Sequence, residues 1–173
     1  MRQALVVVDM LNDFVLSDAP LVVPANRSII PQLQQRLTKA RAEQTPVIFV
    51  SDAHAPDDRE FERMGWPPHA VAGTPGAQVI NELKPRPDEH QVAKTTYSGF
   101  YRTDLEPLLN KLQVEELILT GCVTNICILY TAADAVMRGY RVCVARDCVA
   151  ALDPAAGHFA LQQMEQILGV TLI

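Results

Sequence analysis

The sequence is poor in positive charge and has no long hydrophobic run. It carries 15 lysines and arginines against 20 aspartates and glutamates, which gives a net charge of −5 over 173 residues. The basic residues are scattered, so the clusters that phosphate contacts need are missing and a nucleic-acid binder is excluded. The apolar run at residues 4–8 ends at Asp9 and is too short for a signal peptide or a membrane span. We therefore expect a cytoplasmic protein that binds a small molecule.

Paired cysteine motifs are also missing. The four cysteines, Cys122, Cys127, Cys143 and Cys148, form no C-x-x-C pair and no Cys/His finger spacing, which argues against a thiolate zinc site. We expect all four to be reduced thiols, because the chain otherwise looks intracellular. The sequence has no internal repeat, low-complexity segment or linker. With 49% hydrophobic residues, it predicts a single domain over residues 1–173.

What the chain does have is a regular alternation of strand-like and helix-like segments. Runs rich in Val, Ile and Leu predict buried strands at residues 4–8, 46–50, 116–120 and 141–145, with weaker candidates at 91–93 and 170–172. Helical periodicity covers residues 28–43, 77–83, 105–111, 125–138 and 155–168. The stretch 51–75 is predicted to be a long irregular, functional loop. This alternation predicts an α/β fold of three layers, α/β/α, with a mostly parallel sheet of about six strands.

Cys127 is the first candidate for chemistry. An apolar strand at residues 117–120 runs through Gly121 into a predicted helix that carries Cys127 in its first turn. Unpaired backbone N–H groups and the helix dipole favour a thiolate there, and nearby amides can hold an oxyanion. The alternative is a buried cysteine that acts only as a small hydrophobic residue.

Two charged residues are predicted to lie beside this thiol. Asp9 follows the strand at 4–8 and Lys94 follows the strand at 91–93, and the carboxyl ends of parallel strands meet at one edge of a sheet. Asp9 as general base would take the Cys127 proton and return it to a leaving amine. Lys94 would lower the pKa of the thiol and keep Asp9 ionised. Alternatively, Asp9 caps the turn at residues 10–13 and Lys94 lies on the surface.

A metal site is predicted next to these residues. Asp52 and His54 stand two residues apart after the strand at 46–50, and His69 follows in the same long loop. One aspartate and two histidines form a common ligand set for zinc, manganese or iron that leaves positions open for water or substrate. Glu60 and Glu62 could add a further oxygen ligand. The alternative is a pair of exposed loop histidines.

The ordered set of motifs resembles one enzyme family over essentially the whole chain. The motifs are Asp9, Asp52-Ala-His54, Trp66-Pro-Pro-His69, Gly73-Thr-Pro-Gly76, Lys94, Tyr97-Ser-Gly-Phe100 and Gly121-Cys-Val-Thr-Asn-Ile-Cys127. In this order they resemble the isochorismatase-like cysteine hydrolases, and among these the nicotinamidases.

The resemblance implies a role for each of these positions. It implies a catalytic triad of Asp9, Lys94 and Cys127, an oxyanion hole formed by the backbone N–H groups of Val123 and Cys127, and a cis peptide bond before Val123. It also implies one divalent metal ion, zinc or alternatively manganese or iron, held by Asp52, His54 and His69. The implied fourth ligand is Glu62, with Glu60 or water as alternatives, and the implied aromatic wall of the substrate pocket is Phe14, Trp66 and Tyr97.

The activity implied by the resemblance is the hydrolysis of nicotinamide to nicotinate and ammonia through a thioester on Cys127. Two alternatives remain open at this point. The same cysteine could act on a ureido, carbamoyl or other small amide, or the fold could serve as a ligand-binding module without catalysis. The expected partner is a small amide, with no nucleic acid and no membrane, and the resemblance implies a homo-oligomer, either a dimer or a tetramer.

Overall fold

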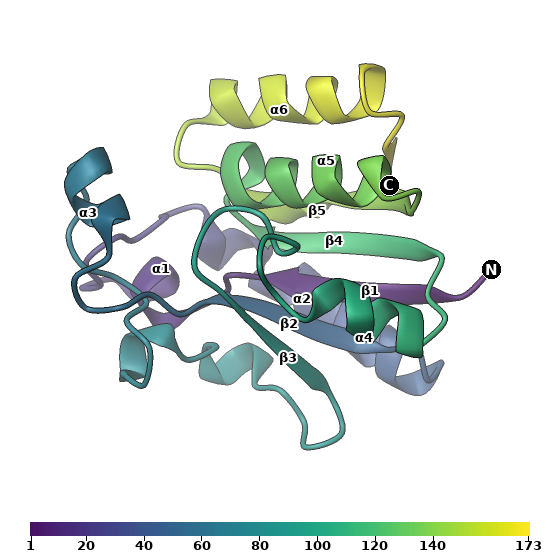
Figure 1. The fold of residues 1–173 in the computed structure, drawn as a ribbon, viewed down its shortest axis with the longest axis horizontal. Helices are drawn as coiled ribbons and strands as arrows, with labels where there is room; N and C mark the ends of the chain where they lie inside the picture. Colours follow the sequence, from purple (N-terminus) through teal and green to yellow (C-terminus); the bar gives the residue numbers. More distant parts are fainter.

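The computed structural model describes residues 1–173 and is built around one parallel sheet of six strands (Figure 1). The strand order across the sheet is β3-β2-β1-β4-β5-β6, and every neighbouring pair is parallel. The strands are β1 (Gln3–Val8), β2 (Val47–Asp52), β3 (His90–Lys94), β4 (Glu116–Cys122), β5 (Arg141–Ala150) and β6 (Thr171–Leu172). The predicted α/β class and parallel sheet are confirmed. The two weaker candidates are the edge strands β3 and β6, which have a neighbour on one side only and therefore need less apolar sequence.

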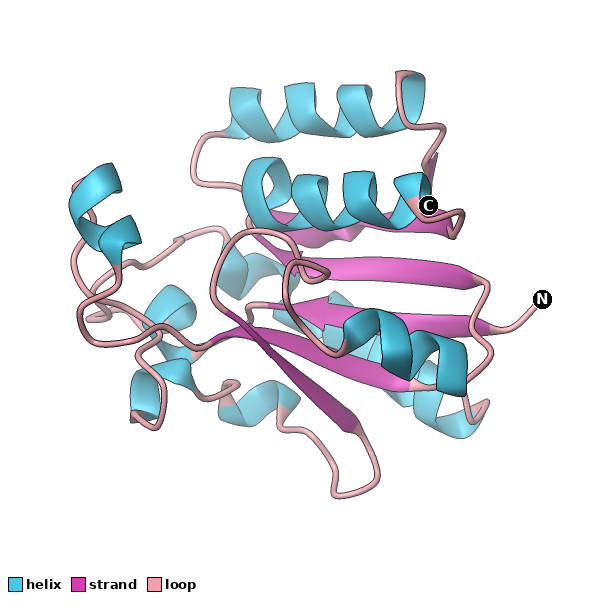
Figure 2. Ribbon diagram, viewed as in Figure 1, coloured by secondary structure: helices cyan, strands magenta, loops and turns pink.

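Helices cover both faces of this sheet (Figure 2). The α-helices are α1 (Asn12–Val15), α2 (Asn26–Ala42), α3 (Arg59–Met64), α4 (Leu105–Lys111), α5 (Leu129–Met137) and α6 (Pro154–Gln166). Alternate residues of β1 face opposite sides. Leu5 and Val7 pack with α2, whereas Val6 and Val8 pack with α4 and α5. Two hydrophobic layers therefore hold the sheet between them. No helix is long and apolar enough to cross a bilayer.

The prediction of a helix over residues 77–83 is wrong. Two short 3₁₀ turns, Pro75–Ala77 and Asn81–Leu83, stand there instead. The residues between them are extended because they pair with the segment that leaves β1: Val79 forms an antiparallel bridge with Leu11, and the Ile80 N–H donates to Met10 O over 3.0 Å. Tertiary pairing overrides the local helical pattern here.

The stretch 51–75 is less irregular than predicted, because it contains α3. Asp58 caps this helix by accepting a hydrogen bond from Glu60 N over 2.9 Å, and Gly65 ends it with a left-handed φ of 66°. Both are ordinary helix boundary signals. The helix holds a glutamate against the metal-ligand candidates, as described below.

Candidate active site

The ends of three strands bring Asp9, Lys94 and Cys127 together. Asp9 follows β1, Lys94 ends β3, and Cys127 lies in a π-helical turn, Thr124–Ile128, that continues from β4 into α5. Lys94 Nζ lies 2.7 Å from Asp9 Oδ2 and 3.4 Å from Cys127 Sγ. A carboxylate oxygen of Asp9 lies within 4.8 Å of the same sulfur. All three side chains are buried, so the alternatives of a turn cap for Asp9 and a surface position for Lys94 do not describe this structure.

The backbone around Asp9 aims its carboxylate at this point. Asp9 has a left-handed φ of 50°, which turns the chain out of the sheet, while its N–H still donates to Val50 O over 3.0 Å. Its Oδ1 accepts a hydrogen bond from Asp52 N at 2.8 Å, so only Oδ2 is left for Lys94 and the thiol. A carboxylate fixed by the neighbouring strand has little freedom to turn away from the sulfur.

The pKa of the Cys127 thiol is raised, which corrects the expectation of a lowered pKa. Burial raises the pKa of this thiol, and although Lys94 lowers it, Asp9 and Asp52 raise it again, so that the pKa lies well above its ordinary value. Burial is the largest of these effects on the pKa. Burial and Asp52 also raise the pKa of Asp9, to about 6, against the opposing effect of Lys94. The sulfur therefore needs a base to become a nucleophile, and Asp9 is the acceptor within reach.

Asp52, His54 and His69 also converge, as predicted from their spacing. One ligand atom from each lies within 4.8 Å of the others, and all three side chains are buried. The Nδ1 atoms of both histidines are already paired, His54 with Asp58 Oδ2 at 3.1 Å and His69 with Pro67 O at 2.8 Å. Such partners fix the ring orientation of metal-binding histidines and leave Nε2 for the ion.

The chemistry of this donor set fits a divalent cation. His54 Nε2 is buried without a hydrogen-bond partner and lies 3.6 Å from Asp52 Oδ2 and 3.8 Å from Glu60 Oε2. Burial lowers the pKa of His54, but the negative charges of Asp52, Asp58 and Glu60 together have the larger, opposite effect and raise this pKa to about 9. So much negative charge around one buried imidazole favours a positive charge at this point.

Glu62 does not reach this cluster, which corrects the expected fourth ligand. It lies on the exposed side of α3, whereas Glu60 is 6% exposed and faces His54. Residues two apart on an α-helix point in nearly opposite directions, so both glutamates cannot face the same site. The alternative that the sequence analysis kept open, Glu60, is the one that the structure brings to the cluster.

A narrow cavity of about 40 Å³ lies directly beside Cys127. Phe14, Trp66 and Tyr97 line it, as the resemblance implies, and Val123 lines it next to the sulfur. The metal-ligand candidates Asp52, His69 and Glu60 form its polar edge. The remaining lining residues are Leu21, Val23, Ile126 and Leu152. The sequence does not mark these four, because an aliphatic residue carries no signal of its spatial neighbours, whether it lies in a loop or, like Ile126, in the turn that holds Cys127.

The peptide bond between Cys122 and Val123 is cis, as the resemblance implies. The preceding residue, Gly121, has a φ of 106°, and a Cβ added to it would lie 2.0 Å from Val8 O. Only glycine fits at this close approach between β4 and β1. The chain is thereby directed so that Val123 and Cys127 both face the narrow cavity.

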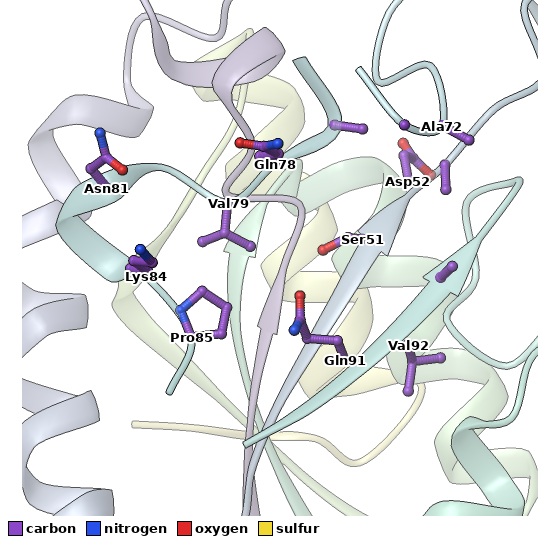
Figure 3. Close-up of a pocket in the computed structure, with 14 residues that line it drawn as sticks. Ser51, Asp52, Ala72, Gln78, Val79, Asn81, Lys84, Pro85, Gln91 and Val92 are labelled. Atoms are coloured by element: carbon purple, nitrogen blue, oxygen red, sulfur yellow. The ribbon is translucent and has the colours of Figure 1, made fainter. Parts of the chain in front are cut away.

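A second and larger cavity, of about 500 Å³, lies between the edge of the sheet and the segment 72–85 (Figure 3). In Figure 3, Ser51 and Gln91 extend from the strands toward Val79 and Gln78 of the facing segment. Asp52 is the only residue that it shares with the narrow cavity. It contains neither Cys127 nor an aromatic side chain, so we assign the reactive site to the narrow cavity.

The family model of the isochorismatase domain matches residues 3–172 of this chain. The chain belongs to the isochorismatase family. Among solved structures of this family, the nicotinamidase/pyrazinamidase from Bacillus subtilis superposes with a TM-score of 0.92 at 31% identity, over 99% of both chains. The N-carbamoylsarcosine amidase from Thermoplasma acidophilum gives a TM-score of 0.90 at 35% identity, over 99% of this chain and 95% of that one.

A third member of the isochorismatase family carries a metal ion. The pyrazinamidase of Pyrococcus horikoshii, solved in complex with zinc, is 30% identical and superposes with a TM-score of 0.93, over 100% of this chain and 99% of that one. The family relatives thus include amidases that act on different amides, and this chain is an isochorismatase-family hydrolase with the six-stranded fold that they share.

Proposed function

We propose that this protein is a metal-dependent cysteine amidohydrolase that converts nicotinamide to nicotinate and ammonia. The observation that carries the proposal is the lining of the narrow cavity beside Cys127, which is aromatic and aliphatic on most sides and contains no lysine or arginine. Such a lining suits a flat, neutral ring. The carboxylate and imidazole edge suits a metal that contacts the ring.

Asp52, His54, His69 and Glu60 would hold the divalent ion, and zinc fits this nitrogen and oxygen donor set. When bound, the ion would supply a Lewis-acid contact for a ring nitrogen and so fix the orientation of the amide above Cys127. The residues that would hold the metal bind and orient the substrate, and Asp9 carries out the proton transfers.

The acylation half of the reaction follows from the contacts of Asp9 and Cys127. Asp9 accepts the thiol proton, and the sulfur forms a bond with the amide carbon. The backbone N–H groups of Val123 and Cys127 stabilise the negative charge on the carbonyl oxygen. As the carbon–nitrogen bond breaks, Asp9 returns the proton to nitrogen and ammonia leaves, with the acyl group held as a thioester.

The deacylation half uses the same groups with water in place of the thiol. Asp9 takes a proton from water, the hydroxide oxygen bonds to the thioester carbon, and the carbon–sulfur bond breaks to give nicotinate and a sulfur that regains its proton. Lys94 contacts Asp9 and the sulfur, so its positive charge balances the negative charge that moves between them.

The second candidate is the hydrolysis of carbamoyl amides, which the 35% identity to N-carbamoylsarcosine amidase favours. N-Carbamoyl amino acids carry a carboxylate. No lysine or arginine lines this cavity to pair with that carboxylate, and Asp52 and Glu60 at its edge would repel it. Nicotinamide is therefore preferred over these acids.

Ammonia release from a panel of amides tests the proposed function. The panel contains nicotinamide, an N-carbamoyl amino acid and an aliphatic amide, and the metal content of the purified protein is measured by elemental analysis. We expect bound metal and ammonia from nicotinamide, with no turnover by the Cys127→Ala variant. If only the N-carbamoyl amino acid is hydrolysed, nicotinamide is not the substrate. If Cys127→Ala is as active as the wild type, the cysteine mechanism is rejected.

A further inference from the structure

A chain of hydrogen bonds runs behind the active site through two residues that the proposed mechanism does not use. Asn26 Nδ2 donates to Phe14 O at 2.9 Å and to Cys122 Sγ at 3.2 Å. The Cys122 thiol in turn donates to Asp9 O at 3.2 Å. Asn26 and Cys122 are both 0% exposed. The chain therefore joins the pocket wall at Phe14 to the proposed general base, Asp9, through groups that solvent does not reach.

The carbonyl group of Asp9 needs this donor because the sheet no longer supplies one. The pairing of β1 with β4 ends at Val8 and Gly121, and the left-handed φ of Asp9 takes its carbonyl out of the ladder. A buried carbonyl without a partner is costly, so the Cys122 thiol satisfies a requirement that the geometry of the base creates.

Asn26 holds the other end of this chain. It is the first residue of α2, and its backbone N–H donates to Val23 O at 2.9 Å while its side-chain amide uses both hydrogens on Phe14 and Cys122. Phe14 and Val23 both line the narrow cavity. Asn26 thus fixes two wall residues, one through its backbone and one through its side chain, and the sulfur of Cys122.

Cys122 also precedes Val123, whose backbone N–H belongs to the proposed oxyanion hole. A shift of Cys122 would therefore move the amide that receives the developing charge as well as the carbonyl of the base. Neither Asn26 nor Cys122 lines the narrow cavity, so neither touches a bound substrate.

We propose that Asn26 and Cys122 are positioning residues that keep the base Asp9 and the amide of Val123 in register for the attack by Cys127. The proposal rests on the proposed cysteine hydrolase mechanism. Because the two residues act on groups that work in the transition state, their loss lowers kcat and leaves KM unchanged. A misplacement of 1 Å can lower the rate by roughly 100-fold. We expect a smaller displacement in Cys122→Ala and therefore a loss of kcat of about tenfold.

Three cysteine variants, together with Asn26→Ala, test this role against a purely structural one. Cys122→Ala removes the donor and acceptor, Cys122→Ser restores both, and Cys148→Ala removes an equally buried thiol from the same hydrophobic layer away from the site. We expect kcat to fall in Cys122→Ala, to recover in Cys122→Ser and to stay at the wild-type value in Cys148→Ala. KM should be the same in Cys122→Ala and Cys148→Ala, whereas the thermal midpoint should fall further in Cys122→Ala, because this variant leaves the Asp9 carbonyl without its donor. Asn26→Ala should lower kcat as Cys122→Ala does, and the double variant should add nothing further.

A substrate-independent measurement separates this inference from the proposed function. The rate at which iodoacetamide alkylates Cys127, followed by peptide mass spectrometry, depends on proton transfer from the thiol to Asp9 and needs no amide substrate. We expect slower alkylation of Cys127 in Cys122→Ala and wild-type alkylation in Cys122→Ser, whichever amide the enzyme hydrolyses. Unchanged kcat and alkylation in Cys122→Ala, or equal defects in the Ala and Ser variants, would overturn the positioning role.

Discussion

At the scale of single residues, Asp52 links the proposed catalytic triad with the proposed metal site. Its Oδ1 lies 2.5 Å from Lys94 Nζ, and its Oδ2 lies 3.6 Å from His54 Nε2. Lys94 and His54 thus share one buried carboxylate, and Asp52 N also donates to Asp9 Oδ1. Changes at the metal site are therefore expected to reach the base and the thiol through Asp52.

An Asp52→Asn substitution should disturb both sites at once. The amide is a poor metal ligand, so we expect at least a tenfold loss of metal affinity. It also leaves the buried Lys94 with one anionic partner in place of two, so we expect kcat to fall by about tenfold or more. His69→Ala is the matched comparison, because His69 belongs to the metal cluster without contacting Lys94. Chelator competition gives the affinity, and kinetics at saturating metal give kcat. A kcat defect of the same size in His69→Ala would contradict the link.

Glu60 and Glu62 form a matched pair for the fourth metal ligand. Glu60 is buried against His54, and Glu62 is exposed on the same helix. We expect Glu60→Gln to weaken metal binding by about 10-fold to 100-fold and Glu62→Gln to leave it unchanged. Titration against a chromophoric chelator measures both. Equal affinities in the two variants would show that water, and not Glu60, completes the ligand set.

At the scale of elements, the sequence predicted what apolar patterning controls. Continuous Val, Ile and Leu runs predict the four central strands, shorter apolar segments mark the edge strands β3 and β6, and the strand-to-helix connection at Gly121 locates Cys127. The segment 77–83 was misread because its partner, Met10–Leu11, lies far away in the sequence. The resemblance implies Glu62 rather than Glu60, and because the sequence does not predict α3, it cannot show which of the two glutamates faces the metal-ligand candidates. Nothing in the sequence marked Asn26, whose contacts are all with distant segments or a neighbouring turn.

The junction of β1 and β4 should tolerate no side chain at Gly121. A Cβ there would meet Val8 O at 2.0 Å, and the positive φ adds strain, so we expect Gly121→Ala to lower the free energy of unfolding by more than about 3 kcal/mol. Gly139 also has a positive φ, of 88°, but open space around it, so Gly139→Ala should cost only about 1 kcal/mol. Urea denaturation measures the two free energies. Similar losses would mean that backbone strain, and not the close approach, decides the choice of glycine.

At the scale of the whole molecule, the narrow cavity is formed where the rigid sheet meets the long segment 53–73. Around it, the strand ends of the sheet hold Asp9, Lys94 and Asp52, whereas the segment holds His54, His69 and Glu60. Two backbone hydrogen bonds join the start of the segment to its end: His54 N donates to Ala70 O at 3.0 Å, and Ala72 N donates to His54 O at 2.9 Å. A metal held by Asp52 from the sheet and by histidines from the segment would add a cross-link between the two.

This arrangement predicts that metal removal destabilises the protein as well as inactivating it. An ion that binds only the folded chain stabilises it by about 2.7 kcal/mol at 100 times its Kd, and for a chain of this size that corresponds to roughly 5 to 10 °C in Tm. We expect the chelated protein to lose nicotinamide binding and to regain both binding and Tm when zinc is added. In His69→Ala zinc should leave Tm almost unchanged, whereas Glu62→Gln should respond as the wild type does. Differential scanning calorimetry with stepwise zinc additions measures the shift, and a wild-type Tm that does not depend on zinc would contradict a cross-link between sheet and segment.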